Sequence, residues 1–311
     1  MQTRPLGDSG IEVSLVGLGC NNFGRRLDLD GTRAVVETAL EAGVTFLDTA
    51  DTYGNGESEK LLGEVLAGHR DEAVITTKFG HDMGGIYGDL GQRGGRAYVR
   101  RAIDGSLERL RTDRVDLYLY HRPDGVTPIG ETLAAMSELV DEGKVRAIGC
   151  SNVTAEQIDE AEDVARRDGL HRWISVQNEY SLLHRDPERD VIPACERYGI
   201  SFVPYFPLAS GLLTGKYRRG GAHPDGTRIG PGDDRLSEDA LDAVEAIAGF
   251  AEERGRSILD VAVGALTAQP AVASVIAGAM SPEQVRANAD AAGWAPSSDD
   301  LAALGSVLAA A

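Results

Sequence analysis

The stretch that decides the fold is Phe46-Leu47-Asp48-Thr49-Ala50-Asp51-Thr52-Tyr53-Gly54-Asn55-Gly56-Glu57-Ser58-Glu59. An apolar run over residues 44–47 ends in the carboxylate of Asp48, and Tyr53 follows five residues later in a turn bounded by glycines. From residue 57 to about residue 66 the pattern is helical. Strand, polar loop and helix in this order form one unit of a parallel sheet. An isolated aspartate and tyrosine of this kind usually have a structural role, the aspartate capping a turn and the tyrosine ring packing on it. Whether they form part of a functional site depends on the residues at the ends of the other strands.

The composition is that of an ordinary globular protein. Its 311 residues are 42% apolar and 26% charged, enough to bury a substantial core. The net charge of −18 and the pI of about 4.7 argue against nucleic acid or an anionic membrane as a partner, because both select for basic surface. No apolar run reaches the length of a membrane span, and the first ten residues lack the apolar segment of a secretory signal.

The three cysteines, Cys20, Cys150 and Cys195, are odd in number and far apart in the sequence. They have no CxxC spacing, so neither a disulfide framework nor a zinc site is expected. This usage is typical of a reducing compartment and predicts a cytoplasmic protein. No feature of the sequence decides the oligomeric state, and a monomer is the default expectation.

Short β-branched runs alternate with longer amphipathic segments along the chain. A hairpin is predicted at residues 3–6 and 11–14, joined by Gly7-Asp8-Ser9-Gly10. Eight strands are predicted at residues 15–19, 44–48, 73–78, 115–120, 145–150, 173–178, 201–205 and 272–277. Helical segments lie between them, for example at residues 32–42, 98–110, 128–142, 155–167, 187–198 and 238–254.

Eight strand–helix units favour closure into a (β/α)₈ TIM barrel over an open doubly wound sheet. The dinucleotide fingerprint GxGxxG also fails after the first strand, where the sequence is Gly17-Leu18-Gly19-Cys20-Asn21-Asn22. No change of composition marks a linker, so residues 1–311 are predicted to form one α/β barrel domain with an N-terminal β-hairpin.

Two long loops interrupt the alternation, at residues 80–95 and 206–236. Each follows the C-terminal end of a predicted strand, the face on which barrel enzymes carry their sites. The second contains the cations Lys216, Arg218, Arg219 and Arg228. Either loop by itself could be a surface insertion without a function. Two long loops on the same face of the barrel favour a role as lids or clamps over a site.

A polar residue stands at the end of one predicted strand after another: Asp48, Lys78, His121, Ser151, Asn152, Gln177 and Tyr205. Each has an ordinary explanation by itself, since lysines often end strands and a Ser-Asn pair often caps a helix. In a barrel, however, all of these residues face one axis, and convergent polar groups form a site.

With these residues in place, the chain resembles the aldo-keto reductase family over nearly its full length. The family's Asp, Tyr, Lys and His tetrad falls on Asp48, Tyr53, Lys78 and His121. The matching segments, all in the family's order, are Leu47-Asp48-Thr49-Ala50-Asp51-Thr52-Tyr53-Gly54, Thr76-Thr77-Lys78, Tyr118-Leu119-Tyr120-His121-Arg122-Pro123-Asp124, Gly149-Cys150-Ser151-Asn152, Val176-Gln177-Asn178-Glu179-Tyr180-Ser181, Tyr205-Phe206-Pro207-Leu208 and Gly211-Leu212-Leu213-Thr214-Gly215-Lys216-Tyr217.

The resemblance implies NAD(P)H-dependent reduction of an aldehyde or ketone to the alcohol, without a metal. Tyr53 would donate the proton that the nascent alkoxide needs, and the ammonium of Lys78 would lower the pKa of Tyr53. Asp48 would hold Lys78 in place. A neutral His121 would hydrogen-bond the carbonyl oxygen of the substrate.

The cofactor contacts are implied in the same way. Ser151, Asn152 and Gln177 would hold the nicotinamide carboxamide, and Tyr205 would stack on the ring. The pyrophosphate would lie under Phe206, Pro207, Leu208, Gly211, Leu212 and Lys216. Gln284 and Asn288 share a helical face and would bind the adenine.

The end of the cofactor site departs from the family's pattern. Many relatives place basic residues near Gly278 and Met280 and at Gln284 to bind the 2′-phosphate of NADP, and here these residues are uncharged. NADP(H) is favoured from the family's habit, and NAD(H) is possible.

Two other functions stay open. One is a regulatory or sensor protein that binds a nicotinamide cofactor with little turnover, like the potassium-channel β subunits of this family. The other is a barrel isomerase or lyase without nicotinamide, which explains the polar rim but not the combination of Tyr205, Gln177 and Ser151-Asn152. The expected partner is a small carbonyl compound whose identity the sequence does not give.

Overall fold

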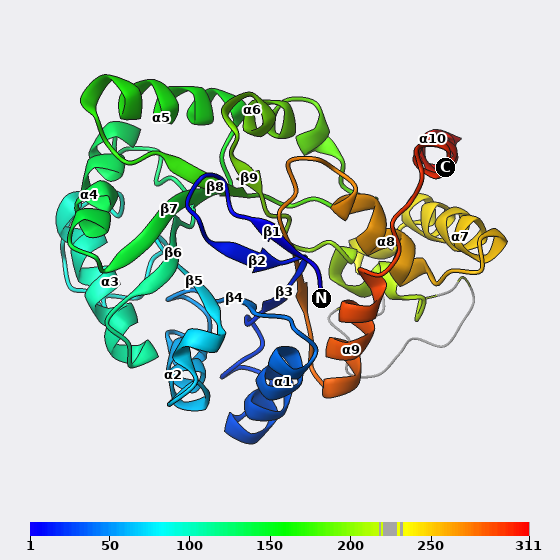
Figure 1. Ribbon diagram of the computed structural model, residues 1–311, viewed down its shortest axis with the longest axis horizontal. Helices are drawn as coiled ribbons and strands as arrows, with labels where there is room; N and C mark the ends of the chain where they lie inside the picture. Colours follow the sequence, from blue (N-terminus) through cyan, green and yellow to red (C-terminus); the bar gives the residue numbers. More distant parts are fainter. Residues whose placement is uncertain (218, 220–228, 231–232, 311) are drawn as a thin grey trace.

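The computed structural model describes residues 1–217, 219, 229–230 and 233–310. Eight parallel strands lie in the order β10-β3-β4-β5-β6-β7-β8-β9 and curl into a ring surrounded by helices (Figure 1). Parallel bridges between Phe202 and Val272 and between Tyr205 and Ile276 close the ring between its two end strands. The predicted (β/α)₈ barrel is therefore confirmed. The strands are β3 Val16–Gly19, β4 Phe46–Asp48, β5 Val74–Phe79, β6 Val115–Tyr120, β7 Val145–Ser151, β8 Trp173–Gln177, β9 Ser201–Phe202 and β10 Val275–Gly278.

Several helices begin where a polar side chain caps them. The Asp28 carboxylate accepts a hydrogen bond from the Gly31 amide at the start of α1, and Thr154 with Gln157 forms a capping box at the start of α5. The helices are α1 Leu29–Glu41, α2 Glu57–Val65, α3 Arg96–Leu110, α4 Ile129–Asp141, α5 Ala155–Asp168, α6 Val191–Tyr198, α7 Glu238–Glu253, α8 Ile258–Thr267, α9 Pro282–Ala291 and α10 Ser298–Ala310, with short 3₁₀ turns η1 Arg70–Glu72, η2 Asp186–Glu188, η3 Ala209–Thr214 and η4 Asp234–Leu236.

Several strands and helices are shorter in the structure than the sequence predicted. β4 starts at Phe46 rather than residue 44, and the amides of Thr45 and Phe46 both donate to the Ser14 hydroxyl. β9 ends at Phe202 rather than residue 205, since Pro204 has no amide hydrogen for a strand ladder. The helix predicted at residues 187–198 is divided into η2 and α6, which begins after its capping residue Asp190.

The predicted N-terminal hairpin consists of β1 Thr3–Pro5 and β2 Glu12–Ser14. It lies across one end of the ring (Figure 1). Leu6, Ile11 and Val13 of the hairpin region are buried in one apolar cluster with residues of five barrel strands, including Leu117 and Ile174. The hairpin thus covers the N-terminal end of the barrel and leaves the C-terminal end for a site.

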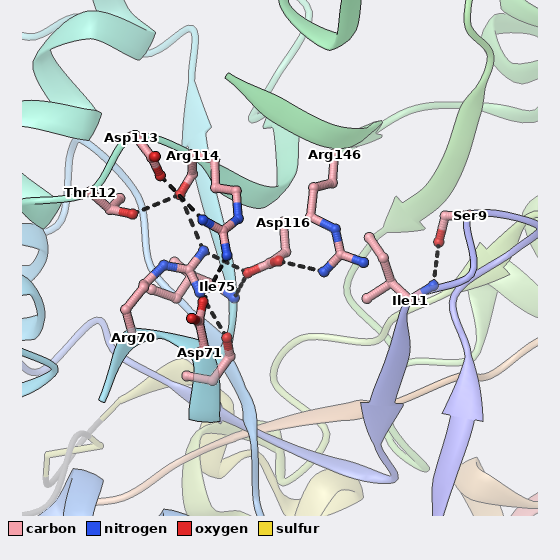
Figure 2. A network of polar contacts seen from close by, with 11 residues as sticks. Ser9, Ile11, Arg70, Asp71, Ile75, Thr112, Asp113, Arg114, Asp116 and Arg146 are labelled. Atoms are coloured by element: carbon pink, nitrogen blue, oxygen red, sulfur yellow. Dashed lines mark hydrogen bonds and ion pairs between the residues drawn. The ribbon is translucent and has the colours of Figure 1, made fainter. Parts of the chain in front are cut away.

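A polar network ties the strand starts together beside the hairpin (Figure 2). Its centre is Asp116 on β6, which is only 3% exposed. One carboxylate oxygen accepts hydrogen bonds from Arg70 at 2.7 Å and from the Ile75 amide at 2.9 Å, and the other accepts one from Arg146 at 2.8 Å. A buried carboxylate with both oxygens bonded stabilises the packing of β5, β6 and β7.

Three further features bear on the class of protein. The described helices include none with the length and apolar character that a membrane crossing requires. Cys20, Cys150 and Cys195 are buried free thiols. Among the described residues, no three potential His, Cys, Asp or Glu ligands gather into a metal site.

Candidate active site

The four residues of the predicted tetrad come from three neighbouring strands and one turn. Asp48 is the last residue of β4, Lys78 the next to last of β5, and His121 follows directly after β6. Tyr53 is delivered by the turn between β4 and α2, in which Asn55 has a φ of 54°. Left-handed backbone of this kind favours asparagine and glycine, which explains the Gly54-Asn55-Gly56 sequence after the tyrosine.

Lys78 joins Asp48 to Tyr53. Its ammonium, which is fully buried, donates hydrogen bonds to the Asp48 carboxylate at 2.8 Å, the Thr49 carbonyl at 2.9 Å and the Tyr53 hydroxyl at 3.3 Å. Burial lowers the pKa of Lys78, but the Asp48 and Tyr53 oxygens outweigh it and leave the pKa above its ordinary value. The lysine therefore stays charged, and the predicted pairing with Asp48 is present.

The pKa of Tyr53 differs from the expectation. Burial is the largest influence and raises the pKa of Tyr53, while Lys78 lowers it and Asp48 raises it again, so the net direction is upward. The predicted lowering by Lys78 is therefore present, but burial of the phenol outweighs it, and the sequence did not show how completely the phenol is buried. Since an ammonium has only donors, the Tyr53 oxygen accepts from Lys78 and keeps its own hydrogen for another acceptor.

His121 is held as a neutral imidazole, as predicted. Its pKa lies well below the ordinary value because of burial, with further lowering by Lys78, His81 and Arg122. The ring meets Tyr53 edge-on with centroids 6.0 Å apart, and meets His81 in the same way at 4.4 Å. The buried Nδ1 of His121 has no hydrogen-bond partner in the part of the chain that the structure describes.

The four residues expected around the nicotinamide lie together beside this group. The Gln177 amide donates to the second Asp48 oxygen at 2.9 Å, and the Ser151 hydroxyl donates to the Gln177 carbonyl at 2.6 Å. Asn152, with a φ of 59°, donates to the His121 carbonyl at 2.9 Å and accepts from the Tyr205 hydroxyl at 2.8 Å. The ends of β7 and β8 are thus bonded directly to the strand ends that carry the tetrad, and Tyr205, after β9, is joined to them through Asn152.

The segment after β9 has an unusual backbone. Phe206, Ala209 and Ser210 all have positive φ values, and Phe206 is 37% exposed next to the Tyr205 ring. Strained residues of this kind concentrate where a ligand is bound. The Lys216 ammonium lies so close to Gly211 that a Cβ there would come within 2.8 Å of it. Pro207 and Leu212 are buried, and Leu208 is half-buried.

Of the other basic residues predicted in this loop, Arg219 is described by the structure. Arg219 forms ion pairs with Glu238 and Asp242 of α7. Arg218 and Arg228 lie outside the described residues.

The residues predicted for the adenine end lie where β10 passes into α9. The Gln284 side chain accepts a hydrogen bond from the Met280 amide at 2.8 Å, and Asn288, which is buried, donates to the Gly278 carbonyl at 3.4 Å. Ser281 caps the helix. These five uncharged residues lie together where β10 leads into the N-terminus of α9.

Comparison with known proteins agrees with this geometry. The sequence profile described as "Aldo/keto reductase family" matches residues 15–309. The chain belongs to the aldo/keto reductase family. This family consists of oxidoreductases that in general use nicotinamide cofactors, mostly NADP(H), on small carbonyl substrates.

Full-length relatives of this aldo/keto reductase carry different names. It is 34% identical to aldo-keto reductase YhdN of Bacillus subtilis (strain 168), covering 99% of this chain and 94% of that protein. It is 35% identical to a probable voltage-gated potassium channel subunit beta of Oryza sativa subsp. japonica, covering 93% and 90%. It is 33% identical to L-glyceraldehyde 3-phosphate reductase of Escherichia coli (strain K12), covering 94% and 87%.

Sequence reasoning missed a buried polar chain behind the tetrad of this aldo/keto reductase. The Tyr87 hydroxyl donates to Asp51 at 3.2 Å and accepts from Arg109 at 2.9 Å, and Arg109 also donates to Glu59 at 2.7 Å. Burial and the Glu59 charge raise the pKa of Asp51 to about 8. The only signal in the sequence was that Asp51 lies in the segment of residues 46–59 that contains Asp48 and Tyr53. Tyr87 lies in a glycine-rich loop that has no helical or strand periodicity.

Asp48, Tyr53, Lys78 and His121 line neither of two cavities found in the described part of the protein. One of about 330 Å³ is lined by Asn152, Asn178 and Tyr205 and by residues that follow β8, so it adjoins the proposed nicotinamide contacts. A larger one of about 550 Å³ lies on the outside between α2 and α3, with Tyr87 and Arg109 in its wall. Because the tetrad lies at the barrel mouth, the candidate active site is located there, although the outer cavity is larger.

Proposed function

We propose that this aldo/keto reductase reduces an aldehyde or ketone to the alcohol with NADP(H). The observation that carries the proposal is the fully buried Lys78 ammonium, bonded to both Asp48 and Tyr53, beside a neutral His121. An acid, a charged lysine and a neutral imidazole around one phenol provide a proton donor and a hydrogen-bond donor for a single carbonyl oxygen.

The chemistry that the nicotinamide supplies when bound is hydride donation to the carbonyl carbon. Tyr53 then acts as general acid, since its proton is not shared with Lys78 and protonates the oxygen on which negative charge develops. Lys78 stabilises the phenolate left behind, and Asp48 keeps the ammonium in place. The neutral His121 donates a hydrogen bond to the same oxygen and orients the carbonyl group.

The residues present fit a nicotinamide dinucleotide. Asn152 and Ser151 already have their side chains fixed at the strand ends, and Tyr205 is half-buried with its ring at the wall of the 330 Å³ cavity. Lys216, next to the strained backbone of Phe206–Gly211, provides a cation for the pyrophosphate. Gln284 and Asn288 would contact the adenine. We favour NADP(H) over NAD(H) because most of the family uses it.

The buried free thiols support a cytoplasmic location for the enzyme. We propose that residues 1–311 act as one catalytic unit and, by default, as a monomer. The proposed partner is a small carbonyl compound.

The test is a spectrophotometric assay of NADPH and NADH oxidation with a panel of aldehydes, ketones and sugars. The proposal expects carbonyl-dependent oxidation at a kcat of at least about 1 s⁻¹ for the best substrate, with NADPH preferred. Tight NADPH binding without carbonyl-dependent oxidation across the panel would contradict it.

That outcome would instead favour the second candidate, a nicotinamide-binding regulatory or sensor protein. The observation in its favour is the similarity to the rice protein named as a probable potassium channel subunit beta. In that case NADPH would bind tightly, as followed by its fluorescence, while turnover would be slower than about 0.01 s⁻¹. The two candidates therefore differ in rate, not in cofactor binding.

A further inference from the structure

The glycine-rich loop between β5 and α3, residues 80–95, is hydrogen-bonded to the barrel by a tyrosine in its middle. Tyr87 is only 6% exposed. Its hydroxyl donates to the Asp51 carboxylate at 3.2 Å and accepts from the Arg109 guanidinium at 2.9 Å. Among the described residues, no other residue from 82 to 91 hydrogen-bonds outside this loop. Tyr87 therefore anchors the loop to the barrel.

Helix α3 leaves space for this tyrosine. A Cβ at Gly105 of that helix would come within 3.2 Å of the Tyr87 ring and within 2.9 Å of the Arg109 guanidinium. Glycine is a poor helix former, so its place inside α3 is explained by this close approach and not by helix propensity. The Tyr98 ring, also on α3, meets Tyr87 edge-on with centroids 5.4 Å apart. The Tyr87 ring is thus packed into a place that fits it.

Arg109 and Asp51 complete a closed cycle of hydrogen bonds behind the tetrad. Arg109 also donates to Glu59 at 2.7 Å, and Glu59 accepts from the Thr77 hydroxyl at 2.5 Å. On the other side, the Asp51 amide donates to the Lys78 carbonyl at 3.1 Å. The cycle therefore starts at Thr77 and returns to the next residue, Lys78. Because Asp51, Glu59 and Thr77 are fully buried, these bonds do not compete with water.

Asp51 is the member of the cycle that lies on the turn of the proposed proton donor. It precedes Tyr53 by two residues, and the Tyr53 amide donates to the Ala50 carbonyl at 3.1 Å within the same turn. The Tyr53 hydroxyl lies 3.3 Å from the Lys78 ammonium. A displacement of a catalytic group by about 1 Å can lower a rate about a hundredfold. The bond from Tyr87 to Asp51 restrains the turn against such a displacement.

We propose that Tyr87 is a positioning residue for the reduction: through its hydrogen bond to Asp51 it holds the turn that presents Tyr53. The glycine-rich loop and the proton donor then form one unit, and the donor is correctly placed only while the loop is docked. This inference rests on the proposed carbonyl reduction and assigns Tyr87 no contact with the reacting atoms. Loss of the Tyr87 hydroxyl should slow proton donation and leave the binding of the carbonyl compound unchanged.

The experiment measures single-turnover NADPH oxidation as a function of aldehyde concentration in the wild type and in Tyr87→Phe. The substitution keeps the ring and removes the hydroxyl, and the aldehyde is the one that the wild type reduces best. The maximal rate reports the placement of the proton donor, and the half-saturating concentration reports aldehyde binding. We expect the maximal rate to fall about tenfold and the half-saturating concentration to change less than about twofold.

Tyr98→Phe is the matched control, because it removes a tyrosine hydroxyl that bonds to the same loop. Tyr98 is as buried as Tyr87, and its hydroxyl donates to the His81 carbonyl at 2.7 Å, where the loop begins. Within the described residues it has no hydrogen bond to the turn of Tyr53. We expect Tyr98→Phe to keep both kinetic quantities within about twofold of the wild type, whatever stability urea denaturation shows it to have lost.

Substitutions of the acceptor test whether Tyr87 acts through Asp51. Asp51→Asn keeps an oxygen for the Tyr87 hydroxyl and should keep the maximal rate within about threefold of the wild type. Asp51→Ala removes the acceptor and should lower the rate about tenfold. The double variant Asp51→Ala/Tyr87→Phe should be no slower than the slower single variant, because both substitutions remove the same bond. A loss equal to the product of the two single effects would contradict action through Asp51.

An unchanged maximal rate in Tyr87→Phe would overturn the inference, and so would a lowered rate that Tyr98→Phe reproduces. A higher half-saturating concentration with an unchanged maximal rate would also overturn it, because the loop would then serve aldehyde binding.

If the wild type reduces no carbonyl compound, the proposed function fails, and hydrogen exchange decides the inference. The measured segment is the peptide that covers residues 49–57, followed by mass spectrometry. Exchange at least about threefold faster in Tyr87→Phe than in both the wild type and Tyr98→Phe would support the restraint on the turn. Equal exchange in the three proteins would contradict it.

Discussion

The two ends of the barrel each carry a buried polar cluster, and the two clusters differ in how their carboxylates and rings are bonded. At the N-terminal end, both oxygens of Asp116 are bonded to Arg70, Arg146 and the Ile75 amide, and the hairpin covers the end (Figure 2). At the C-terminal end, the buried Nδ1 of His121 and one oxygen of Asp51 have no partner within the described residues. The Asp116 carboxylate is thus fully paired and stabilises the fold, although the Arg70 Nε and the Trp173 indole nitrogen at the same end have no partner among the described residues. The unpaired atoms of His121 and Asp51 lie at the end that carries the candidate site and are available to a ligand.

Several residues at the C-terminal end of the barrel also have a strained backbone conformation. Asn152, Phe206, Ala209 and Ser210 have left-handed φ values although none is glycine. Each such residue costs of the order of 1 kcal/mol or more, and it persists only where packing and hydrogen bonds enforce it. We infer that the end closed by the hairpin contributes mainly to stability, while the open end retains backbone strain.

The largest expected effect is on activity, from a substitution at the open end. Lys78→Met removes the charge that stabilises the phenolate of Tyr53 while keeping a side chain of similar length. We expect kcat to fall at least about a thousandfold, with NADPH affinity changed only a few-fold. Steady-state kinetics and NADPH fluorescence titration provide the two measurements. A kcat within about tenfold of the wild type would show that the C-terminal end does not depend on its buried ammonium.

The converse substitution is at the closed end. Asp116→Ala leaves Arg70, Arg146 and the Ile75 amide without their shared acceptor. We expect the free energy of unfolding to decrease by about 3 kcal/mol, while kcat/KM of the folded protein stays within about twofold of the wild type. Urea denaturation and carbonyl reductase assays on the same preparation measure the two quantities. A large loss of activity in the fully folded variant would contradict the claim that the closed end contributes to stability and not to activity.

A smaller effect concerns pH. The pKa of Asp51 is raised from 3.8 to about 8, so between these values the folded protein binds more protons than the unfolded chain. Stability must then fall as the pH rises through this window and level off above about 8. Asp51→Asn does not titrate and still accepts from Tyr87. The variant should therefore gain stability over the wild type by up to about 1 kcal/mol per pH unit as the pH rises.

Urea midpoints of both proteins at several pH values between 5 and 8 test this dependence. The difference between the two proteins removes the contributions of all other titrating groups. A difference that stays constant with pH would mean that Asp51 is ionised in the folded protein, and that the open end does not hold a protonated acid.

The sequence predicted the barrel because its strands and helices follow one another with clear periodicity, and it predicted Asp48, Lys78 and His121 because each ends a strand. The bond from Gln177 to Asp48 spans 129 residues and appears only when the ring closes. The hydrogen bonds of Tyr87 to Asp51 and Arg109 depend on how the glycine-rich loop packs against the barrel, which no local sequence pattern predicts. The pKa direction of Tyr53 was missed for a related reason: it depends on the extent of burial.

The central claim is that the open end supplies the proton through Tyr53. The most direct test is the single-turnover rate of NADPH oxidation by Tyr53→Phe, loaded with NADPH and mixed with a saturating aldehyde that the wild type reduces. The account predicts a rate at least about a thousandfold lower than in the wild type, with the NADPH dissociation constant changed less than about threefold. A rate within about tenfold of the wild type would contradict it, because proton donation would then not depend on the Tyr53 hydroxyl.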